Sequence, residues 1–298
     1  MRTLYIIRFT SAKLKQRIVM EKGKTPAVTI CIPHWQVKEL ITICLRAIRK
    51  FTRDVPYEVI VVDNGSEDES LDYLRNLPWI KLIQRGDGTS ANPSEAHRTA
   101  LDIALKNCQS DYFVAMHTDT IVKHPDWLKR MVRPFENDQR CGAVGAWKLE
   151  LRNPLYEFTK KITDTKKFKL WLRRTLLRDK NARQLKRELC PRDYCAVYRA
   201  EPLRKHRLKF NANGPYAGYT AGEQMYYQLK DKGYHAHVIP TAEMMKYMVH
   251  LAHATAGLRP KQRHLNHWKA QKKSERKIRK FFNSPLVKQL QQEKSLDK

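Results

Sequence analysis

The chain has 298 residues and a formal net charge of +28 at pH 7, and 42% of its residues are hydrophobic. This apolar content is sufficient for a packed core and excludes a wholly disordered basic protein. No apolar run approaches the roughly 20 residues of a membrane-spanning helix, and residues 4–7 are too short for the apolar region of a signal peptide. We therefore expect a cytosolic protein. The six cysteines have spacings that indicate neither a disulfide framework nor a paired zinc site, and we interpret them as free thiols.

The positive charge is concentrated in three segments. Residues 1–25 carry +6, residues 151–192 carry +10 and residues 259–298 carry +10, whereas the rest of the chain carries only +2. This distribution predicts a nearly neutral core with three basic attachments. Such attachments are typical of proteins that meet a polyanion, either a nucleic acid or the anionic face of a membrane. For any one segment alone, a solvated helix surface is the alternative.

Predicted strands and helices alternate along the first half of the chain. Buried strands are indicated by short runs of β-branched and apolar residues, and helices by apolar residues at helical spacing. This alternation predicts an α/β fold with a parallel sheet and a nucleotide-sized crevice at the carboxyl ends of its strands. The predicted strands are 28–32, 57–62, 80–83, 112–116 and 141–149, and the predicted helices are 39–51, 66–72, 94–106 and 125–135.

The second half is more basic. Residues 155–189 have apolar residues, including Trp171, among Lys and Arg, and they predict one or two basic amphipathic helices. A strand is predicted at 194–200, a helix at 222–232 and a strand at 235–239. From residue 258 onward the chain is predicted to be basic, mostly helical and outside the core.

Polar residues follow two of the buried strands. Asp63 comes directly after the second strand, where a carboxylate faces the crevice and can accept hydrogen bonds from a base or a ribose. His117 and Asp119 follow the fourth strand, and residues two apart there point the same way, so both could converge on one cation. The alternatives are a turn aspartate at Asp63 and a helix-capping or strand-end role at Asp119.

Two further sets of residues are weaker candidates. Glu223 lies at the start of a predicted helix, where the helix dipole alone favours a carboxylate. His250 and His253 follow a strand-like stretch and could add a nitrogen to a metal shell, although isolated histidines are more often ordinary core or surface residues.

Taken in order, these segments resemble the family 2 glycosyltransferases of the GT-A fold. Residues 26–36 (PAVTICIPHWQ) resemble the opening strand of that family, and residues 57–68 (YEVIVVDNGSED) resemble its second strand and the acidic turn after it. Residues 96–98 (AHR) stand where the family often has Ala-Arg-Asn. The match extends over residues 26–258, which is the same core that the charge distribution isolates. The remaining matching segments are residues 112–120 at the Asp-x-Asp strand, residues 124–128 (HPDWL), residues 194–202, and GEQ at 222–224 with the helix end at 229–234.

The resemblance implies a nucleotide-sugar donor, a divalent cation (Mn²⁺ or Mg²⁺) on its diphosphate, and inversion at the anomeric carbon. In such a reaction the cation neutralises the leaving diphosphate, and a carboxylate deprotonates the acceptor hydroxyl. Carried over by position, the donor-binding residues are Pro33, Trp35, Asp63, Arg98 and Thr118, the metal-binding residues are Asp119, His117 and His250, and the catalytic residue is Glu223. Trp35 would stack on the nucleobase.

The chain departs from the family pattern at two positions. His117 replaces the first aspartate of Asp-x-Asp, which predicts either a lower metal affinity or a different metal shell. Gln224 replaces the aspartate that usually serves as the base, and an amide cannot accept a proton. Glu223 is the nearest carboxylate in sequence, but another carboxylate could act instead, or catalysis could be impaired.

We therefore expect a GT-A domain at 26–258 flanked by a basic N-terminal segment (1–25) and a basic helical tail (259–298). The favoured function is an inverting, metal-assisted glycosyltransferase at the cytosolic membrane face, acting on a lipid-linked or cell-envelope glycan. An anionic membrane surface is then the expected partner of the basic segments. The alternatives are a nucleotide-sugar-binding protein with impaired transfer and a nucleic-acid-binding protein. The last is disfavoured because no nucleic-acid-binding module is recognisable.

Overall fold

A computed structural model describes residues 27–85, 92–147, 149, 188–252, 254–258 and 268–298. Its centre is a seven-stranded sheet with the order β3-β2-β1-β4-β7-β6-β8. All neighbouring strands are parallel except β7, which runs antiparallel to both β4 and β6. The strands are β1 (Val28–His34), β2 (Tyr57–Asp63), β3 (Ile80–Gln84), β4 (Tyr112–Met116), β6 (Cys141–Ala146), β7 (Cys195–Arg199) and β8 (His235–Ile239).

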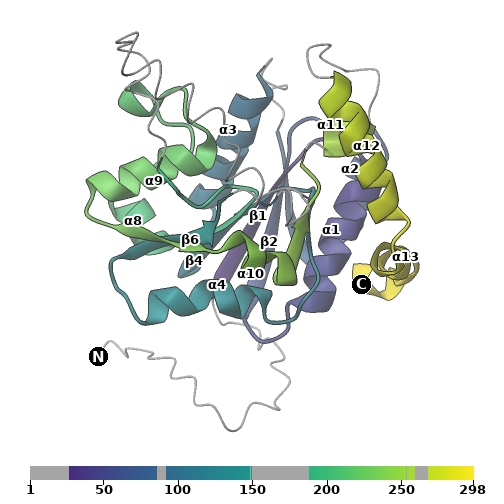
Figure 1. Ribbon diagram of the computed structural model, residues 1–298, viewed down its shortest axis with the longest axis horizontal. Coiled ribbons are helices and arrows are strands. Elements are labelled where there is room, and N and C mark those ends of the chain that lie inside the picture. Colours follow the sequence, from purple (N-terminus) through teal and green to yellow (C-terminus); the bar gives the residue numbers. More distant parts are fainter. Residues whose placement is uncertain (1–26, 86–91, 148, 150–187, 253, 259–267) are drawn as a thin grey trace, which may run out of the picture.

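Helices cover both faces of this sheet (Figure 1). Side chains alternate along each strand, so Ile30 and Ile32 of β1 pack on one face while Cys31 packs on the other. The first face is covered by α1 (Lys38–Phe51) and α4 (Trp127–Glu136), and the second by α3 (Pro93–Lys106), α8 (Ala200–Lys205) and α9 (Ala221–Asp231). The short helix α2 (Ser70–Arg75) lies between β2 and β3.

A two-stranded antiparallel ribbon lies beyond the end of β4. It pairs β5 (Thr120–Val122) with β9 (Met248–His250), and its register places Thr120 opposite His250. The sequence prediction did not include this ribbon, because three-residue strands are too short to show a periodic pattern. It is followed by α11 (Ala254–Leu258), and α10 (Thr241–Tyr247) precedes β9. The ribbon brings a distant part of the chain to the carboxyl end of β4.

The C-terminal segment packs against the sheet domain, which differs from the prediction that it lies outside the core. Helix α13 (Pro285–Gln292) lies beside α1 in Figure 1, and its Val287 and Leu290 are fully buried in the same core cluster as the α1 side chains. Arg46 of α1 donates hydrogen bonds to the carbonyl oxygens of Leu290 and Gln291 at 2.9 and 2.7 Å, and to both carboxylate oxygens of Asp297. The preceding helix α12 (Trp268–Phe282) buries Ile278.

The other two basic segments cannot be compared with the structure. Residues 1–25 and nearly all of 155–189, including Trp171, lie outside the described residues. Within the described part of the chain, no helix is both long enough and apolar enough to cross a bilayer.

Candidate active site

A cavity of about 380 Å³ opens at the carboxyl ends of β1 and β4. This is the position at which open parallel sheets bind ligands, and the volume lies in the range of small-molecule sites. Five of the residues selected from the sequence line it, together with six others. The lining residues are Pro33, His34, Trp35, Asn64, Pro93, Ala96, His97, His117, Thr118, Asp119 and Thr255.

The loop after β1 is held in an unusual backbone conformation. Gln36 and Val37 both have positive φ angles, 55° and 67°, which are uncommon for residues with a side chain. The turn after β2 stabilises them: Ser66 Oγ accepts a hydrogen bond from the Gln36 amide, and Asp68 Oδ2 accepts one from the Val37 amide, each at 2.7 Å. The acidic turn therefore fixes the loop that carries Trp35 into the cavity.

Asp63 organises this same turn. Its buried carboxylate accepts hydrogen bonds from the amides of Gly65 and Ser66 and from the Ser66 hydroxyl. The tight turn requires φ of 81° at Gly65, which glycine adopts without strain. Asp63 thus occupies the turn-stabilising position that was the alternative to donor binding, while its neighbour Asn64 lines the cavity. Its role toward a donor stays a prediction.

Asp119 is buried at the junction of β4 and the ribbon. Its Oδ1 lies 3.2 Å from His250 Nε2 and 3.6 Å from His117 Nδ1, and its Oδ2 accepts a hydrogen bond from the Ala254 amide at 3.3 Å. The three ligand atoms of Asp119, His117 and His250 lie within 4.8 Å of one another. The structure therefore brings together the three side chains selected as metal ligands, although His250 is more than a hundred residues away in sequence. His253 lies outside the described residues.

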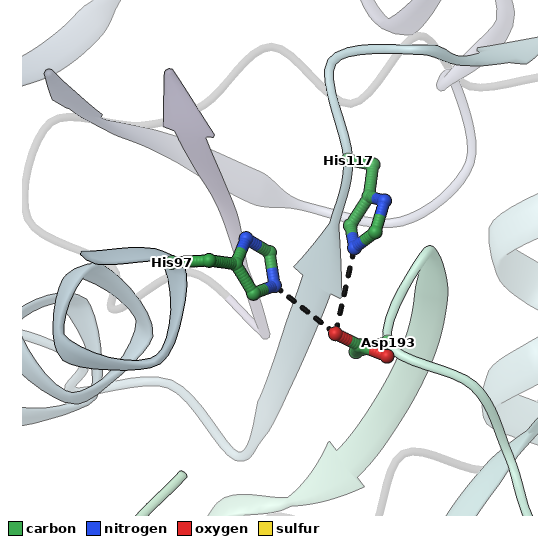
Figure 2. Close-up of side chains that lie close together, drawn as sticks. All are labelled: His97, His117 and Asp193. Carbon is green, nitrogen blue, oxygen red and sulfur yellow. Dashed lines mark hydrogen bonds and ion pairs between the residues drawn. The ribbon is translucent and has the colours of Figure 1, made fainter. Parts of the chain in front are cut away.

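A second carboxylate, which the sequence analysis missed, lies on the other side of His117. Asp193 Oδ2 is 3.4 Å from His117 Nε2 and 3.1 Å from His97 Nε2 (Figure 2). Asp193 lies two residues before β7, and because β7 is antiparallel to β4, the start of β7 lies next to the end of β4. The hydrogen bond from the His117 amide to the Tyr194 carbonyl, at 3.0 Å, fixes this contact. Asp193 could have been found only by knowing that β7 reverses direction.

The electrostatics of this cluster are dominated by His117. Burial alone would lower the pKa of His117, but the flanking carboxylates outweigh it and raise the pKa to about 10. Burial would raise the pKa of both carboxyl groups, but the imidazoles beside Asp119 and Asp193 hold the pKa of each well below its usual range. Burial lowers the pKa of His97. Without a bound cation, a protonated His117 therefore bridges two ionised carboxylates.

Two other predicted site residues are not among those that line the cavity. Arg98 donates hydrogen bonds to the Asn211 side chain at 3.0 Å and to the Tyr219 carbonyl at 3.4 Å, whereas its neighbour His97 lines the cavity. Glu223 is buried at the start of α9, where it forms a capping box with Thr220 and an ion pair with Arg192 at 3.0 Å. Its catalytic role stays a prediction.

Comparison with known proteins agrees with this architecture. The sequence model of "Glycosyl transferase family 2" matches residues 29–207, which is more than half of the chain, so the chain belongs to this family. The strand order and the family membership together confirm the predicted GT-A class. An uncharacterized glycosyltransferase of Haemophilus influenzae is 26% identical over 122 residues, which cover 41% of this chain and 36% of that relative.

Two solved structures to which this chain is similar contain nucleotide sugars. The mannosyltransferase PcManGT from Pyrobaculum calidifontis, solved with GDP-Man and Mn²⁺, is 20% identical with a TM-score of 0.49, and the match covers 76% of this chain and 59% of that one. TarS residues 1–349 from S. aureus, solved with UDP-GlcNAc, are 17% identical with a TM-score of 0.42, covering 70% and 53%. The chain thus spans less than two thirds of each of these relatives.

Proposed function

We propose that this protein transfers a sugar, with inversion, from a nucleotide-diphosphate sugar to a glycan or lipid-linked acceptor. The observation that supports this function is the cavity at the carboxyl ends of β1 and β4, lined by Pro33 and Trp35 at the end of β1 and by Thr118 and Asp119 in the loop after β4. An aromatic ring suits a nucleobase, and a buried carboxylate with neighbouring imidazoles suits the cation that accompanies a diphosphate.

The side chains around Asp119 are chemically suited to a divalent cation. A carboxylate oxygen and two imidazole nitrogens lie within 4.8 Å of one another, which is a set of ligand types that Mn²⁺ accepts. Asp119 and His250 would hold the ion, with Nδ1 of His117 as a third ligand. A cation bound there neutralises charge on the leaving diphosphate. Trp35 and Pro33 would hold the base, so that the sugar is oriented before the acceptor arrives.

Glu223 is our candidate for the catalytic base, although its side chain already has partners in the structure. It is buried and paired with Arg192, and its side chain caps α9. To accept a proton from a hydroxyl, the Glu223 carboxylate would need to leave its ion pair with Arg192.

A second function is favoured by the environment of Gln224. The Gln224 side chain accepts a hydrogen bond from the Ala212 amide at 2.8 Å and donates one to the Tyr219 carbonyl at 3.1 Å. The amide therefore joins the loop before α9 to the helix, a role for which an amide is suited because it donates and accepts at once. This observation supports a GT-A protein that binds a nucleotide sugar and transfers it slowly or not at all.

We base the proposed acceptor and the proposed location of the protein in the cell on the positive charge of its basic segments. The basic segments at 1–25, 151–192 and 259–298 would attract the anionic cytosolic face of a membrane, where lipid-linked acceptors of cell-envelope glycans are found.

Donor binding is tested with the Asp119→Ala variant. Because Asp119 provides the carboxylate of the site, we expect Mn²⁺-dependent binding of GDP and UDP, measured by calorimetry, to weaken at least about 10-fold. Asp126→Ala is the matched control, since Asp126 also follows a histidine by two residues but its side chain is 53% exposed. Undiminished affinity in a folded Asp119→Ala protein would remove Asp119 from the donor site. Sugar release from a panel of nucleotide sugars then separates transfer from binding alone.

A further inference from the structure

We propose that His97, His117 and Asp193 form a second metal site, distinct from the donor cation site at Asp119, that binds a transition-metal ion such as Zn²⁺. This triad joins three elements: His97 comes from the first turns of α3, His117 follows β4, and Asp193 precedes β7. Figure 2 shows both imidazole rings directed at the same carboxylate.

The distances match a metal coordination shell. With metal–nitrogen and metal–oxygen bonds of about 2.0–2.2 Å, neighbouring ligands of a tetrahedral ion lie roughly 3.3 Å apart. The Nε2 atoms of His97 and His117 lie 3.1 and 3.4 Å from Asp193 Oδ2, and all three ligand atoms lie within 4.8 Å of one another. The rings meet edge to face with their centroids 4.7 Å apart, so the nitrogens approach the carboxylate from different directions. An ion could therefore be bound with little rearrangement.

A carboxylate lies beside the second ring nitrogen of His117. A ligating imidazole usually donates its other N–H to a carboxylate, which fixes the tautomer. Asp119 Oδ1 lies 3.6 Å from His117 Nδ1 and favours a proton on that nitrogen. The lone pair of Nε2 then faces Asp193. In this state Nδ1 of His117 is not a ligand of the donor cation, which Asp119 and His250 would hold without it, so the two sites share no ligand atom.

The ligand types suit a transition-metal ion. Two imidazoles and one carboxylate, the same set as around Asp119, suit Zn²⁺, Co²⁺ or Ni²⁺ better than Mg²⁺, which prefers an all-oxygen shell. The site is also open, because His97 and His117 line the 380 Å³ cavity and their side chains are 22% and 32% exposed. Three protein ligands with an open position are typical of zinc sites that hold a water or a substrate atom.

The competing interpretation is a purely ionic cluster. A protonated His117 can hold Asp119 and Asp193 together without any metal, as the raised pKa of His117 describes. A metal ion would replace a proton in this arrangement, because ligating imidazoles must be neutral. The two interpretations differ in whether the chain binds one Zn²⁺ through these side chains.

The test is a Zn²⁺ titration of the full chain in competition with a chromophoric chelator, without any nucleotide. We expect a Zn²⁺ site that His97→Ala and Asp193→Asn each weaken at least about 10-fold. His250→Ala should change the affinity less than about 3-fold, because His250 belongs to the other triad. His235→Ala is the matched control, since His235 forms a His–Asp pair with Asp138 at 2.7 Å on the protein surface. Because no donor is present, the result does not depend on the glycosyltransferase function.

Two outcomes would overturn the proposal. The first is unchanged Zn²⁺ affinity in His97→Ala, which also decides the question if Asp193→Asn fails to fold. The second is a larger loss in His250→Ala than in His97→Ala, which would place the ion at Asp119. Zinc-edge X-ray absorption gives an independent result when wild type and His97→Ala are compared, because both triads offer two imidazoles and a carboxylate. Loss of one imidazole from the zinc shell in His97→Ala supports the site, and an unchanged shell or a sulfur shell contradicts it.

Discussion

The adjacent side chains of Glu223 and Gln224 have different partners at the start of α9. Gln224 joins the backbone at Ala212 and Tyr219, whereas Glu223 caps the helix and pairs with Arg192. If Glu223 is the base, Glu223→Gln should lower turnover about 100-fold with little change in donor affinity. Glutamine can still complete the capping box with Thr220, so the helix start is preserved.

The control for this variant is thermal unfolding, because Glu223→Gln also removes the partner of Arg192. Undiminished turnover would assign the proton transfer to another carboxylate. The companion Gln224→Asp restores the residue that the family usually has, and a rise in activity would show that this chain has lost its base there. Unchanged activity in Gln224→Asp would argue that the amide is needed for its backbone hydrogen bonds.

His34 predicts a pH dependence of stability. Burial lowers the pKa of His34 to about 4, against the opposing pull of Asp63 and Asp68, whereas an unfolded histidine titrates near its ordinary value of 6.5. Between these values the unfolded chain binds a proton that the folded chain excludes, so stability falls as the pH drops from 6.5 toward 4. The shift corresponds to an effect of up to about 3 kcal/mol.

The variant His34→Gln tests whether His34 causes this pH dependence of stability. It removes the imidazole, but glutamine can still pair with the Ser70 hydroxyl that His34 contacts at 2.9 Å. Urea unfolding at pH 7.5 and pH 4.5 should show a smaller loss of stability in the variant than in the wild type. Other groups, among them Asp119 and Asp193, also destabilise the fold in acid. The prediction therefore concerns the difference between the wild type and the variant in the stability lost from pH 7.5 to pH 4.5. An equal loss in both would exclude His34 as a contributor.

At the level of secondary structure, the sequence predicted the long elements well and the short ones poorly. The strands at 112–116 and 235–239 were predicted at their observed boundaries, and the helix at 39–51 within one residue. The predicted second helix starts at Ser70 instead of Ser66, because Asp63, Ser66 and Asp68 together form the turn that holds the β1–α1 loop. Ser66 resembles a helix cap in the sequence, but in the structure Ser66 and Asp68 bind the backbone amides of Gln36 and Val37, about thirty residues away.

The residues of the candidate site also differ in how well the sequence predicts their positions. Asp119 and Trp35 follow strands with a clear pattern and could be placed at the cavity from the sequence. Asp193 and His97 could not, because their convergence depends on β7 running antiparallel to β4 and on which side of α3 faces the cavity. The position of His250 beside Asp119 depends on the β5–β9 ribbon, whose strands are too short to be predicted from periodicity.

The contact between α1 and α13 gives a prediction about the C-terminal segment. Arg46 is buried and binds the last carbonyls of α13 as well as Asp297, so it complements the negative end of the helix dipole. Lysine keeps the charge but cannot reproduce this planar fork. Arg46→Lys should therefore lower the free energy of unfolding by about 2 kcal/mol, measured by urea denaturation.

Arg75→Lys is the control for this experiment, because the side chains of Arg75 and its partner Asp72 are 51% and 78% exposed. An exposed pair of this kind should contribute less than about 1 kcal/mol. Limited trypsin digestion should also cut the Arg46→Lys protein sooner within 283–298 than the wild type. Equal stability and equal digestion would show that the packing of Val287 and Leu290 is sufficient to hold α13.

For the whole molecule, the packing of α12 and α13 changes how its charge must be interpreted. The tail buries Ile278, Val287 and Leu290 in the protein, so these apolar side chains are not available for insertion into a bilayer. Exposed bases remain on the outer side of α12 at Arg276 and Arg279. Any attraction to a membrane through this part of the tail is therefore electrostatic, with each base worth up to about 1 kcal/mol near an anionic surface.

This reasoning gives the last prediction, which concerns vesicle binding. The full chain should sediment with vesicles of anionic lipid, should not sediment with neutral vesicles, and should be released as salt rises, because screening weakens exposed charges. Truncation after residue 258 is a poor test, since it removes buried side chains and would destabilise the fold. Reversal of three exposed bases on α12 is a better one, and we expect it to weaken anionic vesicle binding at least about 10-fold. The three substitutions are Arg276→Glu, Arg279→Glu and Lys280→Glu.

The matched control has the same net charge but changes other exposed bases, with Arg53→Glu, Lys129→Glu and Lys205→Glu. If the tail is the attachment surface, only the α12 variant should lose most of its binding. If both variants lose binding equally, the attraction follows the net charge of +28 and not a particular face. Equal sedimentation with neutral vesicles would contradict electrostatic attachment altogether. Tighter binding to RNA or DNA than to anionic lipid would instead favour a nucleic acid as the polyanion, because phosphate backbones attract basic segments by the same counterion release.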